Sequence, residues 1–232
     1  MLDSFAITRR WPAKDANVIQ LYSLPTPNGV KVSAMLEETG LPYEAHLVNI
    51  MDGDQFTPEY LSLNPNNKIP AIIDPNGPDG TPLPLWETGA ILIYLAEKSG
   101  KFLPTDPSKR AEVLQWLMWQ MGGFGPMLGQ FGFFYAYGGK DIEDKRPMER
   151  YRDEAKRLLA VLDKRLDGRE VVAGDEYSIA DIAIWPWVRA LFTAYNAGDV
   201  LELESFPNVL RWHTSCADRP ASKIAVNVPP RP

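Results

Sequence analysis

The chain has 232 residues and a formal net charge of −6, with 45% hydrophobic and 23% charged residues. This size and composition are typical of a soluble globular protein of one or two domains. Lys and Arg are dispersed among acidic residues, so the basic surface that nucleic-acid binding requires is not expected. No apolar run has the length of a membrane span, and a membrane-embedded protein is therefore not expected either.

The single cysteine, Cys216, excludes an intramolecular disulfide framework and a cysteine-rich metal site. Its helical context predicts a buried or half-buried residue rather than a nucleophile. The two histidines, His46 and His213, are far apart, so the sequence predicts neither histidine-based catalysis nor a metal site. A reducing, cytoplasmic compartment fits these features best.

Residues 1–17 precede the first regular pattern. No apolar stretch follows the pair Arg9–Arg10, so a signal peptide is not expected. We interpret these residues as an N-terminal extension that lies on the surface or is partly disordered. Phe5 and Trp11 are expected to dock part of it on the body of the protein.

The first pattern along the chain is a strand, a helix and a second strand. Val18–Leu24 alternates like a strand, Val30–Thr39 has helical spacing, and Tyr43–Asn49 is again strand-like. This order predicts a right-handed βαβ unit. Before the helix, Thr26 and Asn28 lie where free helix N–H groups are available to an anion, and Asn28 can cap the helix.

A polar loop and two short strands with a helix follow. The segments are the loop Met51–Thr57, a short helix at Pro58–Leu63, a turn-rich stretch at Asn64–Pro70, strands at Ala71–Asp74 and Leu83–Trp86, and a helix from Glu87 to Gly100. The order βαβ, loop, ββα is the thioredoxin arrangement. The first half of the chain is therefore predicted to be a small α/β domain.

Two positions in this half have both an ordinary and a ligand-binding interpretation. The Ile69–Pro70 bond is expected to be trans, since cis is the minority state, although a cis bond would leave the Ile69 backbone free to pair with a peptide ligand. Glu87 and Thr88 open a helix, where they act as a simple cap or as a carboxylate site.

The second half has only helical patterns. Lys101–Asp106 is predicted to be the linker between domains. The helices are expected at Ser108–Met121, Pro147–Leu166, Ile179–Leu191 and Phe206–Ala217, with a break at Gly125–Pro126. Ser178 and Asp181 resemble a capping box that starts the most apolar helix.

An aromatic, glycine-rich stretch at Gly122–Gly139 contains five aromatic residues within seven positions: Phe131, Phe133, Phe134, Tyr135 and Tyr137. Core or dimer packing accounts for most of them. Because one helix face cannot bury all five, some are expected to line an apolar pocket or an interface.

Several motifs in order resemble the glutathione transferase family: PTPNG after the first strand, NPNNKIPA, ETGAIL, GPMLGQ, and ERY followed by IADIAIWPW. The resemblance extends over about residues 18–225 and is narrowest to the Nu class, the bacterial disulfide-bond oxidoreductase type. It implies an α/β thioredoxin-like domain at 18–101, an all-α helical bundle domain at 105–232, and a homodimer.

The resemblance also implies the site residues. Thr26 stands where other classes have a catalytic Ser or Cys, and in the Nu class Thr26 and Asn28 contact the glutathione sulfur. The implied glutathione-binding residues are Thr26, Asn28, Gln55, Lys68, Ile69, Glu87, Thr88 and Arg150. Glutathione, reduced or oxidised, is the implied cosubstrate, and no metal is implied.

Chemistry assigns each of these residues a part of the ligand. Thr88 suits the γ-glutamyl carboxylate, Glu87 the ammonium, and the Ile69 backbone the cysteinyl unit. Lys68, Arg150 and Gln55 suit the glycyl carboxylate. The Thr26 hydroxyl, the Asn28 amide and the helix N-terminus can lower the pKa of a bound thiol.

The leading hypothesis is a glutathione-dependent disulfide-bond reductase whose reacting thiol belongs to bound glutathione, because no protein cysteine is expected at the site. Weak transferase and peroxidase activities are expected beside it. The alternatives are a transferase that conjugates glutathione to small apolar electrophiles and a non-enzymatic glutathione-fold binding protein.

Overall fold

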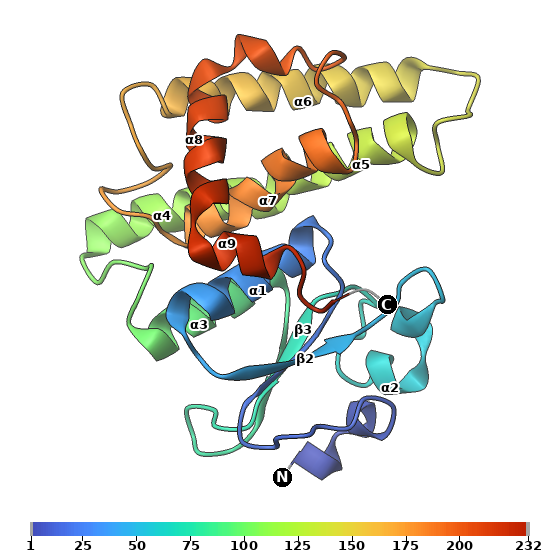
Figure 1. The fold of residues 1–232 in the computed structure, drawn as a ribbon, viewed down its shortest axis with the longest axis vertical. Helices are drawn as coiled ribbons and strands as arrows, with labels where there is room; N and C mark the ends of the chain where they lie inside the picture. The colour runs from blue at the N-terminus through green and yellow to red at the C-terminus, as the bar shows by residue number, and fades with distance from the viewer. Residues whose placement is uncertain (1, 231–232) are drawn as a thin grey trace. The chain divides into compact units, whose positions relative to one another are not determined.

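The computed structural model describes residues 2–230, which divide into two compact units. Unit 1 contains the chain up to Lys101 together with the segment that starts at Pro220, and unit 2 is Phe102–Arg219. Unit 1 has the strands, whereas the described regular structure of unit 2 is entirely helical (Figure 1). The predicted fold class, an α/β domain followed by an all-helical one, is confirmed.

The sheet of unit 1 has the strand order β2-β1-β3-β4. β1 (Ile19–Ser23) pairs in parallel with β2 (Tyr43–Leu47) and antiparallel with β3 (Ala71–Asp74), and β3 pairs antiparallel with β4 (Leu83–Trp86). Every residue of β1 and β3 is buried, while the edge strands β2 and β4 are partly exposed. The two central strands are therefore covered on both faces of the sheet.

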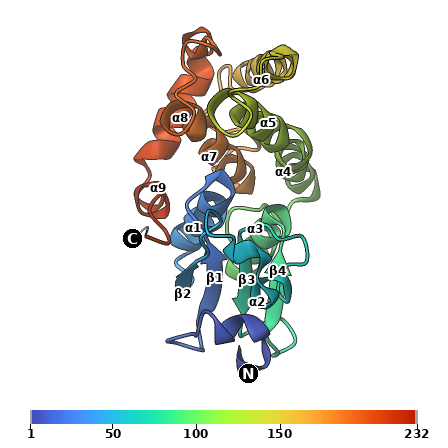
Figure 2. The ribbon, with the colours of Figure 1, turned by 90° about the vertical axis from the view of Figure 1, so that its right-hand side faces the viewer.

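Two helices of unit 1 pack side by side on one face of the sheet, and α2 (Pro58–Leu61) lies on the other (Figure 2). The packed helices are α1 (Pro27–Thr39) and α3 (Thr88–Ser99). α1 ends at Gly40, whose φ of 71° suits a residue without a Cβ. The predicted start of this helix was wrong: it begins at Pro27, and Thr26 rather than Asn28 is its cap.

A short helix near the C-terminal end, α9 (Pro220–Ala225), belongs to unit 1 and was missed from the sequence. It packs against α1, where the Ser33 hydroxyl donates a hydrogen bond to the carbonyl of Ala225 at 3.0 Å. Pro220 at its first position is a helix-start signal that sequence reasoning took for the beginning of a tail. We propose from these contacts that a domain boundary lies near residue 220, in addition to the one expected from the sequence after residue 101.

The N-terminal extension is packed into unit 1, although the sequence favoured a surface or partly disordered segment. It forms two 3-10 turns, Leu2–Ser4 and Ala6–Arg9. Ile7 is fully buried, and Phe5 and Trp11 pack against the same cluster, as expected for these two aromatic residues. This packing is stabilised by the burial of apolar side chains on the face of the sheet that α1 and α3 do not cover.

Unit 2 contains five longer helices in its described residues: α4 (Pro107–Trp119), α5 (Gly125–Ala136), α6 (Arg146–Arg165), α7 (Ile179–Thr193) and α8 (Pro207–Asp218). A π-helical turn, Gln120–Phe124, interrupts α-helical hydrogen bonding between α4 and α5, next to the break expected at Gly125–Pro126. None of the helices described in residues 2–230 is sufficiently long and apolar to cross a membrane.

The buried helix α7 starts with the capping box that the sequence indicated. The Asp181 carboxylate accepts hydrogen bonds from the backbone N–H of Ser178 at 3.1 Å and of Val172 at 2.9 Å. It also accepts one from the indole Nε1 of Trp212 at 2.9 Å. Asp181 therefore joins the start of α7, the loop before it and α8 through one buried group.

Candidate functional site

Four segments of unit 1 meet at one edge of the sheet because of the strand directions. β1 and β4 are each antiparallel to β3, so both end where β3 begins, and β2, parallel to β1, ends there too. The register Tyr22–Ala71–Trp86 runs across these strands just inside that edge. We call this side the loop edge and define it by four segments: residues 24–28, 48–57, 68–70 and 87–88.

The loop edge brings together every predicted ligand-binding residue except Arg150. Thr26 caps α1: its hydroxyl oxygen accepts a hydrogen bond from the Gly29 backbone N–H at 3.3 Å. Asn28 lies in the first turn of α1. Thr26 and Asn28 therefore both lie at the N-terminus of α1, where the free N–H groups and the positive end of the helix dipole favour an anion.

Gly29 sets how closely α1 approaches the end of β1. A Cβ atom at this position would lie 1.9 Å from the Leu24 carbonyl oxygen and 2.6 Å from the Ser23 hydroxyl oxygen. Real Cβ atoms do not approach that closely, so a residue with a side chain would push the helix away. The glycine therefore fixes the position of Thr26 and Asn28 relative to the strand.

The segment before β3 is held by side chains from α2 and its loop. The Lys68 carbonyl accepts hydrogen bonds from the Tyr60 hydroxyl at 2.7 Å and the Asn64 amide at 2.6 Å. The Ile69–Pro70 peptide bond is cis, so the trans bond favoured from the sequence was wrong. Local sequence cannot identify the isomer, because the surrounding contacts select it.

Glu87 and Thr88 form the start of α3. Glu87 has φ 72° and ψ 114°, a conformation that residues with a side chain rarely adopt, and its side chain makes no capping hydrogen bond. Such backbone strain is concentrated at functional positions. Thr88 is 7% exposed, and its hydroxyl oxygen accepts a hydrogen bond from the Lys31 ammonium at 3.4 Å.

Gln55 lies in a 3-10 turn, Asp54–Phe56, within the loop that follows β2. Its Nε2 donates to the carbonyl of Ile50 at 3.3 Å, while its buried Oε1 has no hydrogen-bond partner among the described residues. The assignment of Gln55 to the glycyl carboxylate of glutathione stays a prediction.

Arg150 lies in unit 2, on α6, with its side chain 67% exposed and 3.6 Å from the Glu154 carboxylate. Its role at the site stays a prediction. Cys216 lies in unit 2 as well and is 2% exposed, as the sequence predicted. No segment of the loop edge contains a cysteine.

Comparison with known proteins gives the family. The glutathione S-transferase N-terminal domain model matches residues 17–97, and the C-terminal domain model matches residues 127–220. The disulfide-bond oxidoreductase YfcG of Escherichia coli is 48% identical over 210 residues, covering 90% of this chain and 94% of the relative. The chain belongs to the glutathione S-transferase family.

Solved structures of family members agree with this fold. A glutathione transferase from Pseudomonas putida, with one glutathione disulfide bound per subunit, superposes with a TM-score of 0.97 at 60% identity, covering 98% of this chain and 99% of that one. A glutathione transferase from Burkholderia graminis, with two glutathione molecules bound per subunit, gives a TM-score of 0.98 at 60% identity, covering 100% of this chain and 97% of that one.

Within this glutathione S-transferase fold, Lys31 is a residue that sequence reasoning missed. It is 2% exposed, and it is the one charged residue in the helical run 30–36. Burial lowers the pKa of Lys31 to about 7, and the negative charge of Glu87 opposes that effect. The signal in the sequence was a lone lysine in an otherwise uncharged turn of helix, one turn after Asn28.

Because Lys31 is buried, we expect the free energy of unfolding to depend on pH. Its pKa is about 7 when folded, against an ordinary 10.5. Between these values the unfolded chain binds more protons, so the free energy of unfolding should rise with pH, by at most about 1.4 kcal/mol per pH unit. Urea denaturation across this pH range should show that the free energy of unfolding rises with pH for the wild type and rises less steeply for Lys31→Met. The exposed Lys101→Met is the control, and equal slopes for all three would contradict the prediction.

Proposed function

We propose that the chain is a glutathione-dependent disulfide-bond reductase of the Nu class, in which bound glutathione supplies the reacting thiol. The observation that carries the proposal is the composition of the loop edge: Thr26 and Asn28 at a helix start, with no cysteine in any of its segments. The E. coli relative named as a disulfide-bond oxidoreductase supports the reaction class. The bound glutathione species of the two structural relatives support the cosubstrate.

The residues of the loop edge fit a molecule with two carboxylates, an ammonium and a thiol. Thr88 and the N-terminus of α3 suit the γ-glutamyl carboxylate, and Glu87 suits the ammonium. The backbone of Ile69 suits the cysteinyl unit. Lys68 and Gln55 suit the glycyl carboxylate.

Thr26 and Asn28 are the residues proposed to activate the thiol of bound glutathione. A free thiol is only a few per cent ionised near neutral pH, and the thiolate is the reactive form. A hydroxyl donor, an amide donor and the positive end of α1 lower the pKa of a thiol that lies between them. The Thr26 oxygen already accepts the Gly29 N–H, so its own hydrogen is available to donate to the sulfur.

The reaction is thiol–disulfide exchange in two steps. The glutathione thiolate attacks one sulfur of the substrate disulfide, the S–S bond breaks, and the departing thiolate takes a proton. A second glutathione thiolate then attacks the glutathione sulfur of the mixed disulfide. Glutathione disulfide and the second substrate thiol are released, so two thiols are oxidised and one disulfide is reduced.

The test is a comparison of two activities of the purified protein. Reduction of 2-hydroxyethyl disulfide by glutathione, followed through glutathione reductase and NADPH, should be faster than conjugation of chlorodinitrobenzene. Efficient conjugation without disulfide reduction would favour the alternative, a conjugating transferase. The exposed aromatic residues Phe133 (46%) and Tyr137 (52%) are the observation that favours that alternative.

The proposed mechanism predicts that Cys216→Ala retains its reductase activity. The thiol is buried in unit 2 and is not part of the loop edge. We expect kcat and KM for 2-hydroxyethyl disulfide within about twofold of the wild type, because buried thiols are inert packing residues. Loss of the activity in a variant that keeps its thermal stability would overturn a mechanism without a protein thiol.

We further propose a homodimer in a reducing, cytoplasmic compartment. Exposed apolar side chains support an interface, among them Met51 (85%), Phe56 (60%) and Met118 (51%). The lone buried cysteine is consistent with a compartment that does not form disulfides. Light scattering after size-exclusion chromatography tests the dimer, and a monomer mass would refute it.

A further inference from the structure

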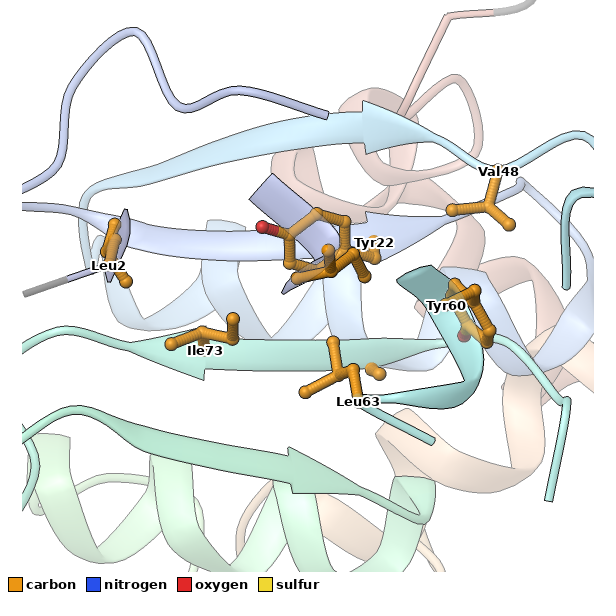
Figure 3. Close-up of a cluster of buried hydrophobic side chains, with 8 residues drawn as sticks. Leu2, Tyr22, Val48, Tyr60, Leu63 and Ile73 are labelled. Atoms are coloured by element: carbon orange, nitrogen blue, oxygen red, sulfur yellow. The ribbon is translucent and has the colours of Figure 1, made fainter. Parts of the chain in front are cut away.

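The N-terminal extension lies against the face of the sheet that is opposite α1 and α3 (Figure 2). Its residues Leu2 and Ile7 belong to one buried cluster with side chains of β1, β3, the α2 region and the residue after β2, namely Tyr22, Val48, Tyr60, Leu63, Ala71 and Ile73. Figure 3 shows Tyr22 and Ile73 on the same face of the sheet as Tyr60 and Leu63. The family model begins only at residue 17, so this covering segment precedes the matched domain.

Trp11 connects the extension to the segment before β3. Its indole Nε1 donates to the carbonyl of Leu47 at 2.8 Å, and its ring makes edge contacts with the rings of Tyr22 and Tyr60, each with a 6.3 Å centroid separation. The Tyr60 hydroxyl in turn donates to the Lys68 carbonyl at 2.7 Å. Trp11 therefore supports the tyrosine that holds one segment of the loop edge.

Ile69 depends on the same cluster. Its side chain is partly buried against the group of residues that the extension completes. Lys68 and Ile69 are adjacent, so the backbone that is proposed to pair with the ligand is held at both residues from the side of the extension. Removing the apolar side chains of the extension would expose this support to water.

Arg10 connects the extension to a second segment of the loop edge. Its guanidinium forms an ion pair with Asp54, whose side chain is 12% exposed. The other carboxylate oxygen of Asp54 accepts the Asn49 backbone N–H at 2.8 Å. Asp54 opens the 3-10 turn that carries Gln55, so Arg10 restrains the turn immediately before that residue.

We propose that residues 2–17 are a brace for the glutathione-binding loops, with Trp11 and Arg10 as positioning residues for segments 68–70 and 48–57. The inference rests on the proposed function, because it assigns these segments to glutathione. The residues of the brace support the loops from the face of the sheet that the extension covers, and they contact no reacting atom. Its effect is to hold two ligand-contacting backbones in place before the ligand arrives.

The test uses the full chain with Trp11→Ala, Trp11→Phe, Arg10→Gln and the matched control Arg9→Gln. Arg9 and Arg10 are both exposed neighbours in the extension, but Arg10 makes the ion pair with Asp54. Three measurements are compared: the Kd for glutathione disulfide by calorimetry, the KM for glutathione against kcat, and amide hydrogen exchange in residues 48–57 and 64–70. Thermal denaturation reports stability separately.

Trp11→Ala should raise the Kd and the KM about tenfold, with less change in kcat, because the ligand then has to order the loop itself. Exchange should accelerate in residues 64–70. Arg10→Gln should raise the Kd about threefold, as expected of a partly exposed ion pair, and should accelerate exchange in residues 48–57. Arg9→Gln should match the wild type in all three measurements.

Each outcome separates the brace from a merely stabilising segment. If Trp11→Ala fails to fold, the test uses Arg10→Gln and Trp11→Phe, which removes the indole N–H bond to Leu47 but keeps an aromatic ring at this position. A lower melting temperature with unchanged Kd and unchanged exchange in both loops would overturn the brace. A wild-type protein that binds no glutathione disulfide would instead overturn the proposed function, while the exchange data would still show whether the extension restrains the loops.

Discussion

Replacing Thr26 with alanine is expected to lower kcat for 2-hydroxyethyl disulfide reduction about 100-fold, the effect of removing one donor that stabilises a developing or bound anion. The hydroxyl is the donor proposed to hold the glutathione thiolate, and its oxygen is already engaged by the Gly29 N–H at 3.3 Å. Affinity for glutathione should change less, because most of the ligand binds at other segments of the loop edge. Steady-state kinetics with separate kcat and KM values check this result.

Thr26→Ser is the matched control, since serine keeps the hydroxyl and the cap. It should retain most of the activity. Thr26→Ala also removes the α1 cap, at a cost of about 1 kcal/mol in the free energy of unfolding, so the assay temperature must lie well below the midpoint of both variants. An unchanged kcat in Thr26→Ala would remove this residue from the catalytic role.

Asp181→Ala is expected to lower the free energy of unfolding by about 3–5 kcal/mol, because each buried donor left without its partner costs about 1–3 kcal/mol. The carboxylate is fully buried and accepts hydrogen bonds from Ser178, Val172 and Trp212. Burial raises the pKa of Asp181, and these donors oppose that effect. Without the carboxylate, buried N–H groups of three different segments lose their partner together.

The control for Asp181 is Asp175→Ala, which removes an exposed carboxylate of the same unit that pairs with Lys109 on the surface. Its unfolding curve should differ little from that of the wild type. Chemical denaturation followed by tryptophan fluorescence measures both variants. A small loss of stability in Asp181→Ala, comparable with that of Asp175→Ala, would contradict the central role of this capping box.

The order of elements could be predicted from the sequence because each leaves a local signal. Alternation marked β1, the turn-rich segments on either side marked β3, helical spacing marked α6, and Ser178 with Asp181 marked the start of α7. The start of α1 was misplaced because Thr26 and Asn28 both carry capping side chains, and only the folded helix start, where the Thr26 hydroxyl oxygen accepts the Gly29 N–H, distinguishes them. The apolar contacts of the extension depend on the open face of the sheet, which no local pattern in residues 1–17 specifies.

Residues of the candidate site could be predicted only where a recognisable sequence motif adjoins the end or the beginning of a strand. Thr26, Ile69 and Thr88 each adjoin a strand, and strand pairing alone brings them to one edge. Lys31 was missed because its burial depends on how α1 packs against α3. Its hydrogen-bond partner Thr88 lies 57 positions later in the chain. The isomer of the Ile69–Pro70 bond is likewise selected by its surroundings.

α9 has a consequence for how the chain is made. Unit 1 is discontinuous: the residues up to Lys101 are joined by α9, whose Ala225 carbonyl accepts a hydrogen bond from the Ser33 hydroxyl. The ribosome therefore delivers all of Phe102–Arg219 before the partner of α1 is synthesised. N-terminal domains usually complete folding first during synthesis. Here the helical unit can complete folding first, while the part of α1 that α9 covers stays exposed until α9 has been synthesised.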